Sequence, residues 1–236
     1  MKEAAITWAA SLLLFTLTTQ AQSSLPLTSD IREIVTLPTV TGLKAVVSEG
    51  ELVFISDNGR FAIKGTLYDT WHKTRITSLA ALKQLSNTLY LDKLGVKLNE
   101  LEPLILADNP VATTASKVVV FVDPRCPHCH KLLQQAKRLS DQFTFQIVAL
   151  PLLSRSSTDM VRQLGCAQDK QQALKALLSG QYQGLIQQPD CDTTPMHRAL
   201  ITGNILGIKA VPFLIAPDGR TFQGVPPSLR QWLLGD

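Results

Sequence analysis

The chain has 236 residues, of which 45% are hydrophobic, and a formal net charge of only +4 at pH 7. This length argues for two domains, because it exceeds what one small domain needs. The mild charge, without a basic stripe interleaved with aromatic residues, argues against a nucleic-acid partner. No segment after the N-terminal stretch is long and apolar enough to span a bilayer.

Residues 1–21 are predicted to be a secretory signal. They combine a lysine near the start, an apolar stretch over 8–17 and small residues before the expected cleavage near Ala21/Gln22. The apolar stretch is too short for a comfortable membrane anchor. The mature chain is therefore expected in an oxidising compartment, where disulfides persist.

Residues 22–75 are predicted to form a small α+β N-terminal domain. A hairpin is expected from Glu51 to Gly65, because two strand-like runs flank the turn sequence Asp57-Asn58-Gly59. So few residues make a small core and leave strand edges unpaired. Pairing with a second copy of the chain would remedy both defects, which makes this a dimerisation domain. Packing on the chain's own C-terminal domain is the alternative.

Residues 76–115 are predicted to be a linker helix followed by a connector. Leucines recur at helical spacing from Leu79 to Leu89, which indicates an amphipathic helix that ends around Gly95. The remainder, up to Ala115, contains turn-forming residues and is expected to connect the two domains.

The segment from Val118 to Cys129 is the most informative part of the chain. A β-branched apolar run predicts a buried strand that breaks at Pro124, and Cys126 and Cys129 then open a segment with helical periodicity. A helix N-terminus supplies unpaired N–H groups and a positive partial charge, and both favour a thiolate. We therefore expect Cys126, at the exposed end of the helix, to attack disulfides and Cys129 to be the resolving thiol.

The two residues between these cysteines are expected to tune them. Pro127 fits the first helical turn, where its missing N–H costs nothing. His128 can place a cation or an N–H donor beside the Cys126 sulfur and stabilise its thiolate. A more stable thiolate makes the pair more oxidising.

A CxxC pair has other uses in proteins. It can be half of a zinc site, but no second CxxC or paired histidine cluster follows, so no metal is expected. The run Cys126–His130 also fits c-type haem attachment, but the preceding strand and the length of the chain argue against it, so no cofactor is expected. A purely structural disulfide is disfavoured because a two-residue spacer makes a small, strained ring.

The rest of residues 116–236 continues as expected for an α/β thioredoxin-like fold with a helical insertion. Further strands are predicted over 143–150, 211–215 and 221–224, and helical segments over 158–178 and 196–206. Pro212 is poorly placed in a central strand. In this fold its role would be a cis Val211–Pro212 bond that faces the cysteines and leaves backbone groups free to bind a substrate strand.

Cys166 and Cys191 are the second pair of cysteines. In an oxidising compartment they are expected to form a structural disulfide, whose loop of about 25 residues would stabilise the fold by roughly 3.5 kcal/mol. Two buried free thiols are the alternative.

Together these motifs resemble the DsbC/DsbG family of periplasmic disulfide isomerases over essentially the whole mature length. The similar blocks are Gly50–Asp69, Phe121–Lys131, Cys166–Lys170, Asp190–Asp192 and Gly224–Pro227. The resemblance implies a periplasmic, V-shaped homodimer whose N-terminal domains pair through edge strands near Gly65. It also implies two kinds of partner: misfolded or disulfide-containing secreted proteins, and a membrane-bound, DsbD-like thiol reductant.

One position departs from the family pattern. Val211 stands where the isomerases usually carry threonine before the cis-proline, and valine combined with Pro127-His128 resembles DsbA-type oxidases. Rearrangement of non-native disulfides is the expected function. A DsbA-like dithiol oxidase on a DsbC-like scaffold and a dimeric holdase chaperone with secondary redox activity remain the alternatives.

Overall fold

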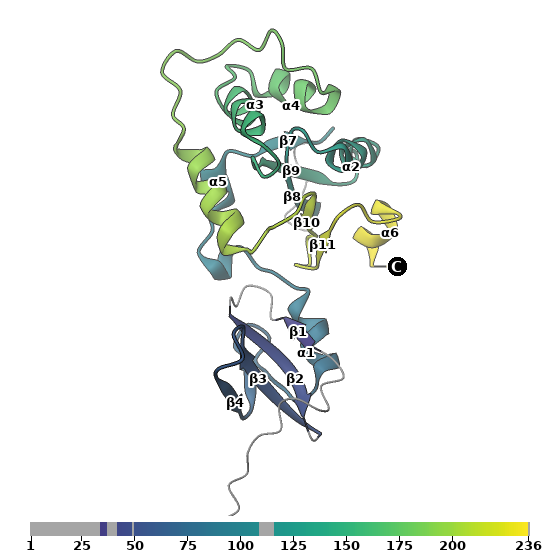
Figure 1. Ribbon diagram of the computed structural model, residues 1–236. Helices are drawn as coiled ribbons and strands as arrows, with labels where there is room; N and C mark the ends of the chain where they lie inside the picture. Colours follow the sequence, from purple (N-terminus) through teal and green to yellow (C-terminus); the bar gives the residue numbers. More distant parts are fainter. Residues whose placement is uncertain (1–33, 37–41, 49, 109–115, 236) are drawn as a thin grey trace, which may run out of the picture.

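A computed structural model of the chain describes residues 34–36, 42–48, 50–108 and 116–235. The predicted signal at residues 1–21 lies outside these ranges. A small sheet domain occupies one end of the molecule and a larger α/β domain the other (Figure 1). None of the described helices is long and apolar enough to cross a membrane.

The small domain contains an antiparallel sheet in the order β1-β2-β3-β4. Its strands are Ile34–Thr36, Leu43–Ser48, Glu51–Ser56 and Ala62–Lys64. Strands β3 and β4 confirm the predicted hairpin, with Phe54 opposite Ile63. The Asn58 side chain closes its turn by accepting a hydrogen bond from the Arg60 N–H. A second ribbon, β5 (Leu67–Asp69) with β6 (Thr74–Ile76), was not predicted.

Helix α1 (Leu79–Ser86) is shorter than predicted. Its first turn is capped by the Ser78 hydroxyl, and Leu79 and Leu82 complete the core of the small domain. The expected continuation to Gly95 is wrong. After the helix ends, the backbone at Leu89 donates a hydrogen bond to the Gly219 carbonyl, and its side chain is buried in the core of the larger domain.

The expected connector also contains regular structure. It includes the 3₁₀ turns η1 (Asp92–Leu94) and η2 (Leu98–Leu101), which pack on the larger domain. Strand β7 (Leu104–Leu106) follows and pairs antiparallel with β9. A strand of three residues among turn formers is too short for its periodicity to be recognised.

The larger domain is built on a five-stranded sheet in the order β11-β10-β8-β9-β7. Strands β8 (Lys117–Val122) and β9 (Thr144–Ala149) are parallel, whereas β10 (Phe213–Ile215) and β11 (Thr221–Gln223) are antiparallel additions. The predicted strands over 143–150, 211–215 and 221–224 are confirmed with shorter bounds.

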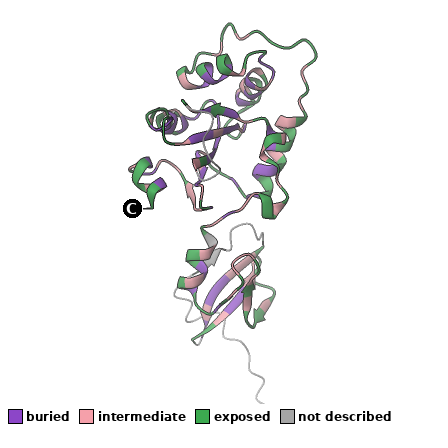
Figure 2. Ribbon diagram, turned by 180° about the vertical axis from the view of Figure 1, so that it is seen from behind, coloured by how far each residue is buried: buried purple, intermediate pink, exposed green. Residues whose placement is uncertain are grey.

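Helices cover both faces of this sheet, and the buried residues concentrate on its strands (Figure 2). Successive β8 side chains point to opposite faces. Val118, Val120 and Val122 therefore pack with α2 (Pro127–Lys137), α4 (Lys170–Ser179) and α6 (Leu229–Leu234). Val119 and Phe121 pack with α5 (Thr194–Ile205) and the segment around η1 and η2.

Helices α3 (Arg155–Gly165), α4 and α5 lie between β9 and β10 in the sequence and form the predicted helical insertion. The single helical segment expected over 158–178 is two helices. Cys166 ends α3, and the Asp169 carboxylate caps α4 by accepting hydrogen bonds from the N–H groups of Gln171 and Gln172.

Candidate active site

The CxxC sequence lies where strand β8 passes into helix α2, as predicted. Cys126 is the N-cap residue of α2, and Pro127 occupies its first turn. The Sγ atom of Cys126 accepts a hydrogen bond from the N–H of Cys129 at 3.2 Å. Cys126 and Cys129 are free thiols in this structure. The first sulfur thus sits at the positive end of the helix dipole, where a thiolate is stabilised.

The predicted exposure of Cys126 is wrong. Cys126 is only 3% exposed, whereas Pro127 and His128, the first two residues of α2, are exposed. The cause is the loop before β10, because the Cys126 thiol points toward the Val211 carbonyl oxygen at 3.5 Å. The Val211–Pro212 bond is cis, as predicted. The Val211–Pro212 loop therefore lies directly beside this sulfur.

Cys129 lies one helical turn further in and is 1% exposed. Burial raises the pKa of its thiol, and the hydrogen bond with Cys126 and the negative charge of Asp123 raise it further. The proton therefore stays on Cys129 at neutral pH. A thiol in this state suits a resolving role, because it attacks only after its proton has been removed.

Asp123, between β8 and the cysteines, is completely buried. Its Oδ1 accepts hydrogen bonds from the Arg125 N–H and the Ser157 hydroxyl, at 2.8 and 2.9 Å. Its Oδ2 accepts from the N–H groups of Leu152 and Leu153, both at 2.8 Å. One carboxylate thus ties the CxxC loop to the β9–α3 loop and to helix α3.

The carbonyl oxygen of Pro124 is a second fixed point in the same loop. It lies 2.9 Å from Nε2 of His130 and accepts a hydrogen bond from the Tyr182 hydroxyl at 3.1 Å. Burial raises the pKa of Tyr182 to about 12, and the negative charge of Asp123 adds to this shift. Tyr182 therefore remains a neutral donor across the working pH range.

The second pair of cysteines forms the predicted disulfide. Cys166 ends helix α3 and is bonded to Cys191, in the loop between α4 and α5, with their Cα atoms 5.3 Å apart. Within the described ranges, no group of three or more His, Cys, Asp or Glu residues is arranged to hold a metal ion.

Comparison with known families decides the identity of this scaffold. Residues 111–233 match the thioredoxin-like domain, and residues 22–78 match the disulfide bond isomerase protein N-terminal domain. The chain belongs to the thioredoxin-like family and carries a DsbC-type N-terminal domain. Its predicted fold class, an α+β N-terminal domain followed by an α/β thioredoxin-like domain, is thereby confirmed.

Its relatives are thiol:disulfide interchange proteins. The chain is 27% identical over 203 residues to the DsbC of Salmonella typhimurium, an alignment that covers 82% of this chain and 77% of the relative. It is 28% identical over 230 residues to the probable DsbC of Bordetella avium, with 92% and 78% covered. The crystal structure of a disulfide interchange protein from Neisseria gonorrhoeae superposes with a TM-score of 0.45, at 23% identity, over 59% of this chain and 95% of that one.

Sequence reasoning predicted the cysteines and the proline loop of this thioredoxin-like site, but not the residues that hold them in place. Asp123 and Tyr182 were missed because their partners come from other elements. The signal for Asp123 is weak but present, since an acidic residue at the end of a wholly apolar strand needs a buried partner. His128 is exposed, and its imidazole forms no hydrogen bond with the residues that the structure describes, so its tuning role stays a prediction.

Proposed function

We propose that this protein is a periplasmic thiol:disulfide isomerase that rearranges non-native disulfides in secreted proteins. The observation that carries the proposal is the asymmetry of the cysteine pair. Cys126 has its sulfur at the helix N-terminus beside the cis-proline loop, whereas burial holds Cys129 protonated.

The reaction follows from this asymmetry. The Cys126 thiolate attacks one sulfur of a substrate disulfide, forms a mixed disulfide and releases the other substrate sulfur as a thiolate. A substrate thiolate then attacks the mixed disulfide, which leaves a new substrate disulfide and regenerates the Cys126 thiolate. No net oxidation occurs in this cycle.

Cys129 provides an alternative way to resolve the mixed disulfide. If it loses its proton and attacks Cys126, the substrate leaves reduced and the pair becomes oxidised. The raised pKa of Cys129 slows this attack and gives the substrate thiols time to rearrange. A membrane-bound, DsbD-like reductant would return the oxidised pair to the dithiol.

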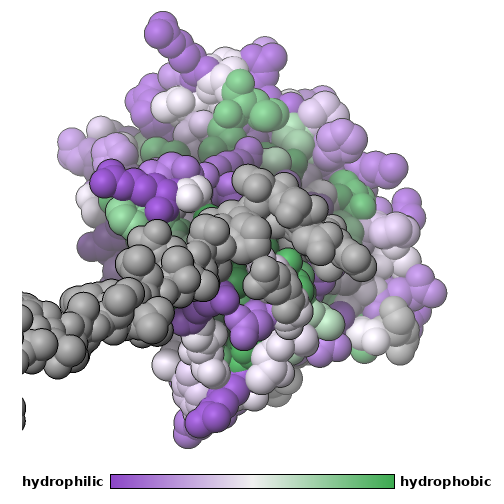
Figure 3. Space-filling view, turned by 60° about the horizontal axis from the view of Figure 1, so that its bottom comes forward, coloured by the Kyte–Doolittle hydropathy of each residue, from purple (hydrophilic) through white to green (hydrophobic). Residues whose placement is uncertain are grey.

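The active-site rim supports a protein as the substrate. Leu152 and Leu153 are exposed next to the CxxC loop, where the Asp123 carboxylate fixes their backbone. Exposed apolar side chains of this kind can contact the apolar residues of an unfolded chain. On the face seen in Figure 3, hydrophobic side chains also reach the surface in several separate patches.

The small domain supports a homodimer. Strand β4 is the edge of its sheet as described, and the side chains of Phe61 and Ile63 are 61% and 57% exposed there. Gly65 directly follows this strand. An unpaired strand edge flanked by exposed apolar side chains favours pairing with a second copy. We therefore place the dimer interface at β4 and Gly65. Separately, we propose that the signal peptide is cleaved near Ala21/Gln22.

An oxidase is the second candidate. Val211 lacks the hydroxyl that isomerases usually carry before the cis-proline, and Pro127-His128 matches the DsbA-type dipeptide. The redox state of Cys126 in cells separates the two functions. An isomerase keeps Cys126 mostly reduced, and an oxidase keeps it mostly oxidised.

Refolding of a scrambled multi-disulfide protein tests the enzyme against the holdase. The Cys126→Ala variant should lose this activity completely, while a Cys129→Ala variant should retain part of it in the presence of a small thiol. If Cys126→Ala refolds the substrate as well as the unmodified protein does, the exchange chemistry is refuted and the holdase is favoured.

A further inference from the structure

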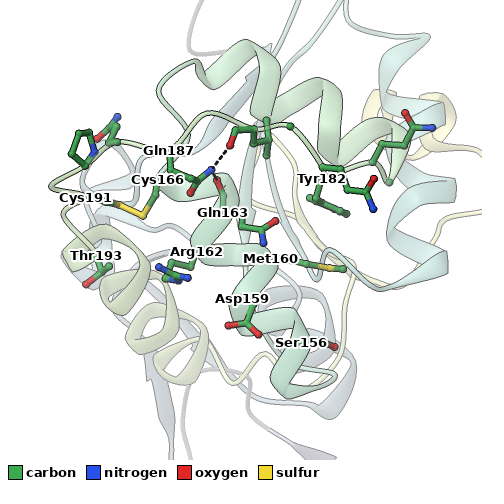
Figure 4. A pocket seen from close by; sticks show the side chains of 17 residues that line it. Ser156, Asp159, Met160, Arg162, Gln163, Cys166, Tyr182, Gln187, Cys191 and Thr193 are labelled. Carbon is green, nitrogen blue, oxygen red and sulfur yellow. Dashed lines mark hydrogen bonds between the residues drawn. A yellow bond between two sulfur atoms is a disulfide. The ribbon is translucent and has the colours of Figure 1, made fainter.

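A groove of about 1200 Å³ lies between helix α3 and the loop that joins α4 to α5 (Figure 4). Residues of α3, among them Asp159 and Gln163, form one side of it, and the loop from Gly180 to Thr193 forms the other. The exchange chemistry proposed above uses neither side. The groove thus offers a surface without an assigned role.

The loop side of the groove is fixed in place. The N–H of Gln168 donates to the Ile186 carbonyl at 3.0 Å, and the N–H of Gln188 donates to the Cys166 carbonyl at 2.8 Å. The disulfide from Cys166 to Cys191 closes the far end. A ligand therefore meets a wall that is already ordered, which lowers the entropic cost of binding.

One end of the groove meets the active-site loop. Tyr182 lines the groove, and its hydroxyl donates to the carbonyl of Pro124 at 3.1 Å. Ser156 also lines the groove, and its hydroxyl accepts a hydrogen bond from the side chain of Arg125, the residue before Cys126. The groove thus runs from the neighbourhood of the attacking sulfur to the structural disulfide.

The lining offers unused hydrogen-bonding groups of both kinds. The side-chain amides of Gln163, Gln181 and Gln183 have no hydrogen-bond partner among the residues that the structure describes. Each amide can donate and accept, which matches the alternating N–H and C=O groups of an extended polypeptide. Met160 and Leu185 add apolar contacts.

The charges of the lining favour the same ligand. Asp159 and Arg162, of opposite sign, both face the groove, and neither forms an ion pair with a residue in the described ranges. A phosphate-bearing ligand would call for an excess of positive charge. A polypeptide of varied sequence needs no such excess and can pair with charges of either sign.

We propose that this groove binds an extended segment of the substrate protein next to the cysteine that is joined to Cys126. The proposal rests on the proposed exchange function and adds a reason for its selectivity. A folded protein cannot thread an extended segment along α3, whereas a misfolded one can. Small disulfides react at Cys126 without using the groove.

Site-specific photo-crosslinking tests this directly in the full-length protein. In a Cys129→Ala background, Gln183 is replaced by p-benzoylphenylalanine, the mixed disulfide with scrambled ribonuclease A is formed, and the sample is irradiated. The matched control carries the same probe at Gln142, an exposed glutamine in the turn after α2. After reduction of the mixed disulfide, the Gln183 probe should retain ribonuclease at least several-fold more than the Gln142 probe.

Equal retention from both positions would overturn the groove while leaving the exchange function intact. Failure to form the mixed disulfide at all would instead refute the exchange function, and the groove proposal with it. The two failures are therefore distinguishable.

Kinetics give an independent readout. The double variant Gln163→Ala/Gln183→Ala should raise the KM for scrambled ribonuclease about fivefold, as expected for the loss of one or two hydrogen bonds. Its rate with glutathione disulfide should not change, because both residues lie outside the CxxC machinery. An unchanged KM for ribonuclease, or an equal effect on both substrates, would contradict substrate binding in the groove.

Discussion

Replacing Asp123 by asparagine should destabilise the larger domain strongly. The carboxylate accepts four hydrogen bonds at 2.8–2.9 Å with no exposure to solvent. Asparagine keeps one acceptor oxygen and turns an NH₂ group toward the donors that the other oxygen served. Two donors then lose their acceptor, at about 1.5–3 kcal/mol each for bonds to a charged group. The expected loss is roughly 3–6 kcal/mol, a large part of a typical total stability of about 5–15 kcal/mol.

Urea denaturation of the reduced protein, followed by circular dichroism, measures this loss. Ser157→Ala is the matched control, because it removes one of the four donors and leaves the carboxylate with three, so its cost should be that of one such bond, about 1.5–3 kcal/mol. If Asp123→Asn unfolds within about 1 kcal/mol of the unmodified protein, the carboxylate does not hold the active-site loop as the structure indicates.

Three further predictions concern other parts of the molecule. Replacing Cys166 and Cys191 together by alanine should lower the free energy of unfolding by about 3.5 kcal/mol, since the disulfide closes a loop with a sequence separation of 25. Calorimetry should then show a Tm lower by roughly 7–14 °C. An unchanged Tm would argue against a stabilising disulfide. Ile63→Asp should convert a dimer into monomers in sedimentation velocity, because Ile63 is 57% exposed on the edge strand β4; a dimer of unchanged affinity would move the interface elsewhere. Burial of Asp69 opposes its ionisation, but hydrogen bonds from His72 and from the backbone lower its pKa overall. This contribution to stability is present above the unfolded-state pKa and is lost as pH falls through the folded-state pKa. Asp69→Asn should therefore reduce the loss of unfolding free energy on acidification. The same dependence of unfolding free energy on pH in both proteins would refute a contribution from Asp69.

The sequence contained enough information for the central site because its signals are local. The change from a β-branched run to helical periodicity around Cys126 placed the cysteines at a helix N-terminus. The proline at position 212 was recognised because it is out of place in a strand. The hairpin at Asn58 was predicted from its turn residues and the strand-like runs on either side of them.

What the sequence did not reveal depends on contacts between distant segments. The groups of Leu152, Leu153 and Ser157 that donate to Asp123 lie 29–34 residues away along the chain. No local sequence pattern predicts these hydrogen bonds. Leu89 kept the helical spacing but packs in the other domain, so tertiary contacts overrode its periodicity. The burial of Cys126 likewise depends on Val211, 85 residues later.

The central claim is that Cys126 is the nucleophile, although its side chain is only 3% exposed in the resting structure. The most direct measurement is the rate at which iodoacetamide alkylates each cysteine of the folded, reduced protein at pH 7, with the modified sulfur located by mass spectrometry. Cys126 should be modified rapidly, whereas Cys129 should stay unmodified because burial raises the pKa of its thiol. If Cys126 reacts only after unfolding, or no faster than Cys129, the account is contradicted.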